Sequence, residues 1–177
     1  MPAFTHTYGR WAVKGSFNKW FADSIDDQGL PSWMAAAVVN FDYPATPVTF
    51  PSFSVTWLGR RAEQVSQGEF VESSGGTRYK GQRWREVIEV RCWETRDGNP
   101  SWEQRLEQMA DMVTRLLQGT KSVAVNDLYA GTASPSATGA ILRVVGIEET
   151  TAPHDPNLSV EQRRFIVTAT WVERWAA

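Results

Sequence analysis

Hydrophobic residues recur at helical spacing in two stretches of the chain. In the first stretch, 11–25, apolar residues lie three and four positions apart, which predicts an amphipathic helix that ends before Gly29. In the second stretch, 101–117, an apolar stripe follows Ser101 and Gln104, which fit the capping box that begins many helices. The sequence therefore predicts two helices, each with one apolar face to bury.

Alternation of apolar and polar residues predicts strands elsewhere. A first strand is expected between Pro51 and Gly59. The clearest alternation covers 83–93 and places Cys92 on the apolar face, which predicts a core thiol and not a nucleophile. The stretch 30–39 mixes helix-favouring alanines with strand-favouring valines, so both structures stay open there. Further strands are expected over 122–129, 140–147 and 164–175.

The polar stretch 61–81 lies between two of these predicted strands. It is rich in Gly and Ser, so it is expected to form a long arm between hairpin strands, with a short strand pair at Phe70 and Val71. Loops of this length inside a compact domain are usually functional or disordered. The arm is therefore a candidate for contact with a partner.

Together, these elements predict a single α+β domain over residues 1–177. Strands joined by short loops pair antiparallel, and two amphipathic helices can cover one face of the resulting sheet. The expected fold is a mostly antiparallel sheet with two helices packed on one face and a long hairpin arm at 61–81. The edges of an open sheet must be blunted, covered or paired with another chain.

Composition narrows the class of protein. The chain has nine Trp, one Cys and a formal net charge of -2 at pH 7. A single cysteine excludes an intrachain disulfide, and Trp is enriched at the centres of protein interfaces. The first ten residues lack the apolar run of a signal peptide, and no run is long enough for a membrane helix. These features indicate a soluble protein made in the cytoplasm.

Candidate catalytic residues are scarce. The two histidines, His6 and His154, are expected in solvent-facing positions, and the common motifs of hydrolases, metalloproteases and nucleotide-binding loops are absent. Asp23, Asp26 and Asp27 cluster at the predicted end of a helix but lack the spacing of a calcium loop. We expect no catalytic residues, no cofactor and no metal, and therefore not an enzyme.

Basic residues bracket the arm at both ends. If the flanking strands pair, these cations come together at the base of the arm. One interpretation is a solvated hairpin whose charges prevent edge pairing. The other is a basic collar that faces an acidic partner surface or passing DNA. The cations are Arg60, Arg61, Arg78, Lys80, Arg83 and Arg85, and the other residues expected at a partner interface are Gln67, Glu69, Phe70, Ser74, Gly75, Gly76 and Tyr79.

The order of elements, with the capped helix 101–117 between sheet strands, the long arm and a terminal strand over 163–175, resembles the tail terminator proteins of tailed bacteriophages. The resemblance covers 10–175 and concerns architecture, size and composition. It implies a structural virion protein at the junction of tail and neck that forms a hexameric ring and caps the tail tube. The implied partners are the tail tube protein, head completion or connector proteins, and DNA passing through the lumen, without a membrane, a cofactor or catalysis.

The chain departs from this family by the undecided segment 30–48 and by its arm. An alternative is another phage neck, baseplate or contractile-injection-machine assembly protein, which would share the same general features. In either case we expect 66–80 to reach an adjacent subunit or the tail tube, because its length and Gly-Ser composition suit an arm that orders on binding.

Overall fold

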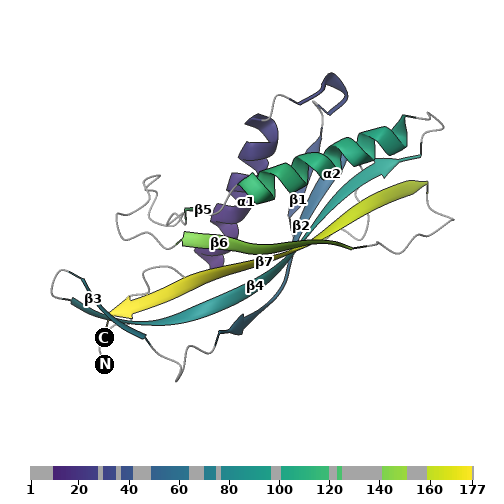
Figure 1. Ribbon diagram of the computed structural model, residues 1–177. Coiled ribbons are helices and arrows are strands. Elements are labelled where there is room, and N and C mark those ends of the chain that lie inside the picture. The colour runs from purple at the N-terminus through teal and green to yellow at the C-terminus, as the bar shows by residue number, and fades with distance from the viewer. Residues whose placement is uncertain are drawn as a thin grey trace.

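The computed structural model describes residues 10–27, 30–34, 37–41, 49–63, 70–74, 77–96, 101–119, 123–124, 141–150 and 159–176. These residues form an α+β fold with one seven-stranded sheet, mostly antiparallel, and this confirms the fold class expected from the sequence (Figure 1). The elements are α1 (Arg10–Asp27), η1 (Ser32–Met34), β1 (Val38–Phe41), β2 (Ser52–Ala62), β3 (Phe70–Ser74), β4 (Thr77–Thr95), α2 (Trp102–Gly119), β5 (Val123–Ala124), β6 (Ile141–Thr150) and β7 (Val160–Ala176).

The sheet has the strand order β1-β2-β4-β7-β6-β5, and β3 pairs with β4 to form a hairpin beside it. The central pair is long: β4 and β7 are paired from Thr95 with Val160 to Tyr79 with Ala176. Figure 1 shows that this pair continues as a ribbon well beyond the end of α2, toward β3. We call the part of β4 and β7 from Tyr79 to Glu86 and from Ala169 to Ala176 the ribbon.

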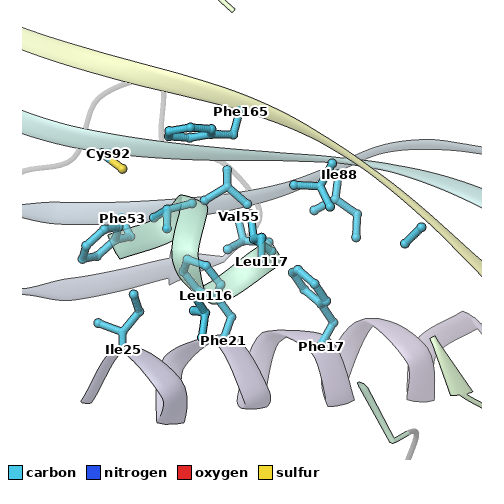
Figure 2. Packing of buried hydrophobic residues seen from close by; sticks show 14 of the residues in the cluster. Phe17, Phe21, Ile25, Phe53, Val55, Ile88, Cys92, Leu116, Leu117 and Phe165 are labelled. Atoms are coloured by element: carbon cyan, nitrogen blue, oxygen red, sulfur yellow. The ribbon is translucent and has the colours of Figure 1, made fainter. Parts of the chain in front are cut away.

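Both helices pack on the same face of the sheet. Phe17 and Phe21 of α1 contact Trp57 and Phe53 of β2, at ring-centroid distances of 5.7 and 6.2 Å. The apolar stripe of α2 is buried against the same face, together with alternate residues of β4 and β7 (Figure 2). The α2 residues in this core are Leu106, Met109, Ala110, Val113, Leu116 and Leu117.

Several boundaries differ from the sequence expectation. The strand expected to end at Gly59 continues to Ala62, and the arm is in part regular strand, because Phe70–Ser74 pairs with the beginning of β4. The open stretch 30–39 contributes η1 and then β1, which pairs parallel with β2. Of the strand expected over 122–129, only Val123–Ala124 is described.

β2 and β6 each contain a β-bulge next to a glycine. In β2, Trp57 pairs with Ile88 and Gly59 with Val87, so Leu58 is an extra residue. A second shift lies between Val144 and Gly146 of β6. Leu58 and Val145 are correspondingly exposed, at 49% and 56%. After Leu58 the faces of β2 are exchanged, because side chains alternate with a period of two residues.

Both glycines that follow the bulges lie in one row across the sheet. Gly59 pairs with Val87, Val87 with Thr168, and Thr168 with Gly146. Bulges bend a strand and increase its local twist. β2 and β6 are therefore kinked at the same level, next to the beginning of the ribbon.

Cys92 is fully buried in the core, as expected from the alternation in β4. Burial raises the pKa of this thiol far above its ordinary value, and the nearby Glu149 carboxylate raises it further, against a smaller opposite effect of Arg163. The folded state therefore keeps the proton at pH values where the unfolded state, with a pKa near 8.5, loses it.

This difference predicts a loss of stability at alkaline pH. Above about pH 8.5 the unfolded state binds fewer protons than the folded state, so the free energy of unfolding falls as pH rises, by at most about 1.4 kcal/mol per pH unit from this group. Urea unfolding at pH 8, 9 and 10 measures the slope, and Cys92→Ala should have a shallower one. Equal slopes in both proteins would contradict the assignment.

Candidate interaction surface

Three arginines lie in one row on the sheet face opposite the helices. Arg61 pairs with Arg85, Arg85 with Thr170, and Thr170 with Arg143, so the row crosses four neighbouring strands. Because Glu86 and Ile88 of β4 point into the helix-covered core, Arg85 and its row neighbours project to the other side. We call Arg61, Arg85 and Arg143 the arginine row.

Charge in the arginine row is only partly neutralised. Glu63 accepts a hydrogen bond of 3.1 Å from Nε of Arg85, and its other oxygen lies 3.9 Å from Nε of Arg83. Arg61 and Arg143 are exposed and form no ion pair within the described residues. The one carboxylate of Glu63 thus contacts two of the four guanidinium groups of Arg61, Arg83, Arg85 and Arg143, which leaves a positive potential on this part of the sheet face.

Arg60 does not join the other cations of the predicted basic collar. Its guanidinium carbon lies 4.2 Å from the ring centroid of Trp84, a cation–π contact on the helix-covered face. The bulge at Leu58 causes this separation, because it places Arg60 and Arg61 on faces opposite to those that simple alternation predicts.

The remaining arm residues are placed only in part. Within the β3–β4 hairpin, Phe70, Ser74, Arg78, Tyr79 and Lys80 pair with Gly81, Thr77, Ser73, Glu72 and Val71, respectively. Gln67, Glu69, Gly75 and Gly76 lie outside the described residues, as do His6 and His154. Arg78 and Lys80 therefore belong to the outer hairpin, several residues beyond the arginine row.

Three buried glutamates on β4 were missed by the sequence reasoning. Glu86, Glu89 and Glu94 are at most 2% exposed, although Glu89 was expected on the solvated face. Each is paired with an arginine from another element: Glu86 with Arg10 of α1 at 3.0 Å, Glu94 with Arg105 of α2 at 3.1 Å, and Glu89 with Arg164 of β7. Three acidic residues within one central strand were the available signal, since a charge buried there needs a partner.

These ion pairs connect the central strand to the elements around it. Trp171 donates to Oε1 of Glu86 at 3.1 Å, and Arg91 donates to Oε1 of Glu89 at 2.7 Å. The three buried carboxylates are thus engaged in ion pairs that join β4 to its neighbouring elements.

A groove of about 420 Å³ lies between the first turns of α2 and the start of β7. Trp102, Leu106 and several charged residues line it, and Glu107 forms an ion pair with Arg163 across it. Among the residues that the structure describes, no group of three or more His, Cys, Asp or Glu side chains is arranged to hold a metal ion. In the same residues, no helix combines the length and hydropathy needed to cross a bilayer.

The sheet also has exposed edges. β1 pairs only with β2 in the described part of the chain, and Val38 and Phe41 on it are 40% and 38% exposed. Among the described residues, β6 is paired on its outer side where Val123–Ala124 meets its first two residues. Edges of this kind can extend into the sheet of another chain.

The fold and this surface define an α+β protein with an open sheet and a basic face. Comparison with models of known protein families finds no match, and the search of curated proteins finds no relative either.

Proposed function

We propose that this protein is a structural component of a phage virion that forms a ring at the junction of tail and neck, caps the tail tube and joins it to the head-side proteins. The observation that carries the proposal is the ribbon of β4 and β7, which projects beyond the end of α2 beside a basic face of the sheet. A projecting ribbon and unpaired edges suit a subunit whose sheet is completed by its neighbours.

Residue chemistry supports assembly over catalysis. The buried carboxylates of Glu86 and Glu94 in β4 are used in ion pairs with the helices, and the arginine row lies on the open face of the sheet. A second candidate is another neck, baseplate or injection-machine assembly protein. The exposed edges at β1 and β6 favour this candidate equally. Whether the protein binds a phage tail tube or the tube of an injection machine distinguishes the two functions.

Solution mass tests the proposal. Light scattering and negative-stain imaging should show a ring, either for the purified protein or when it is mixed with phage tail tubes, with density at one tube end. A protein that stays monomeric and does not bind phage tail tubes would contradict the proposed function. Binding to the tube of an injection machine instead would favour the second candidate.

Shortening the β3–β4 hairpin tests its role in assembly without removing any part of the core. Deletion of 72–77 should leave a folded monomer, because Val71 and Lys80 remain a strand pair around a two-residue loop. We expect this variant to unfold at nearly the wild-type urea concentration but to fail to assemble. Normal rings from the deletion variant would show that the outer hairpin has no role in assembly.

A further inference from the structure

The open face of the sheet, opposite the helices, presents a charge pattern with a definite spacing. Arg61 and Arg143 are three strand separations apart, which corresponds to about 14 Å. Between and beside them the face carries Arg85, Thr170 and the small residue Gly59. Small side chains thus lie beside the arginines on this surface, and its positive charge extends across the strands.

The opposite side of the molecule carries a complementary pattern. Glu103, Glu107 and Asp111 are exposed and recur every four residues, so they form one stripe along α2, of which Glu103 and Glu107 also line the groove beside β7. We call these three residues the acidic stripe. Glu107 also contacts Arg163, whereas Glu103 and Asp111 form no ion pair in the described part of the chain, and Arg115 follows one turn later.

The two patterns match in length. Glu103 and Asp111 are separated by eight residues of helix, which corresponds to about 12 Å. Three carboxylates therefore extend over nearly the same distance as the three guanidinium groups of the arginine row. Since α2 covers one face of the sheet and the row lies on the other, no subunit can join its own two patterns, but two copies placed one on the next can.

Nucleic acid is a poorer fit to the arginine row. Glu63 neutralises part of its charge, so Arg61 and Arg143 remain as the exposed cations of the row, which are few compared with the many phosphate contacts on which nucleic-acid binding depends. The neighbouring row on this face is formed by Gly59, Val87, Thr168 and Gly146, without an aromatic side chain on which a base could stack.

We infer that a second copy of this chain occupies the open face, so that the arginine row of one subunit contacts the acidic stripe of its neighbour. This inference rests on the proposed function. The contact joins two different patches, so an open chain of subunits keeps one free patch at each of its two ends until the ring closes. Exposed charges of this kind set the orientation and the rate of association more than its strength.

Charge exchange tests the contact. Glu103→Lys with Asp111→Lys, and separately Arg61→Glu with Arg143→Glu, should each weaken self-association by at least roughly 100-fold, because like charges then face each other. The four substitutions together should restore it, since the charges are exchanged and complementary again. Sedimentation equilibrium at about 0.05 M and about 0.5 M salt, between which the Debye length falls roughly threefold, measures the association and its weakening by salt.

A control variant has the same change in net charge as Glu103→Lys with Asp111→Lys, but at another place on the surface. Asp23→Lys with Asp26→Lys lies on the exposed side of α1 and should leave the association constant nearly unchanged. Thermal unfolding of every variant checks that the fold is retained.

Three results would overturn the inference. The first is a ring that survives both charge-reversal variants, which leaves the proposed function standing. The second is duplex DNA binding that needs Arg61 and Arg143 while the mass is independent of them, which would assign the face to nucleic acid. The third is a wild-type protein that never self-associates, even on tail tubes, in which case the proposed function fails as well.

Discussion

Phe17→Ala is expected to lower the free energy of unfolding by about 3–5 kcal/mol. Phe17 is completely buried, and its ring lies 5.4 Å from that of Trp20 and 5.7 Å from that of Trp57, measured between centroids. It therefore joins α1 to β2 at the centre of their contact. Removing the ring leaves a cavity bounded by large, stiff neighbours that cannot close it without moving the helix.

Urea unfolding at neutral pH measures this loss. Phe17→Leu is the matched variant, because it keeps most of the volume and should cost roughly 1 kcal/mol. On the exposed side of the same helix, Lys19→Ala removes only the surface pair with Asp23 and should change stability by about 0.3–0.5 kcal/mol. A cost below about 1 kcal/mol for Phe17→Ala would show that α1 contributes little to the folded core.

Glu86→Ala is expected to have a similarly large effect, about 3–5 kcal/mol, by a different mechanism. The Glu86 side chain is 0% exposed, accepts from Trp171 Nε1, and pairs with Arg10 at 3.0 Å. Without the carboxylate, the indole N–H has lost its acceptor inside the core and the guanidinium of Arg10 has lost its counter-charge. Both groups then carry a desolvation cost that nothing offsets.

Glu86→Gln separates the two contributions. The amide oxygen can still accept from Trp171, but the negative charge is gone. Since the Arg10 side chain is 33% exposed, it can recover part of its hydration, so we expect Gln to cost clearly less than Ala. Urea unfolding of the two variants, and of each combined with Trp171→Phe, measures the coupling. Equal losses for Gln and Ala would indicate that the Trp171 hydrogen bond contributes little.

Helices and central strands were predictable from the sequence because each buries one regular apolar face. The stripe of 11–25 and that of 101–117 correspond to α1 and α2, and the alternation around Cys92 correctly identified β4 and its buried face. The pairing of β1 with β2 was not predictable, since a four-residue strand next to prolines carries too little periodic signal.

The candidate surface was predicted only in part, for a physical reason. Arg61 and Arg85 were expected to meet, and they do pair across β2 and β4. Arg143 could not be added, because it comes from a strand far away in sequence whose neighbour depends on the order of the whole sheet. Arg60 was wrongly assigned to the same group, because the regular alternation that precedes Leu58 gives no indication of the bulge.

The extra residue Leu58 has a consequence for how this chain can change over evolutionary time. Losing that one position would move Arg60 to the open face and Arg61 to the face that the helices cover, without any substitution at either arginine. A single-codon deletion or insertion there is therefore equivalent to several simultaneous replacements. Between distant homologues, the pairing partner in β4 is a sounder guide to correspondence at Gly59–Ala62 than the identity of the aligned residue.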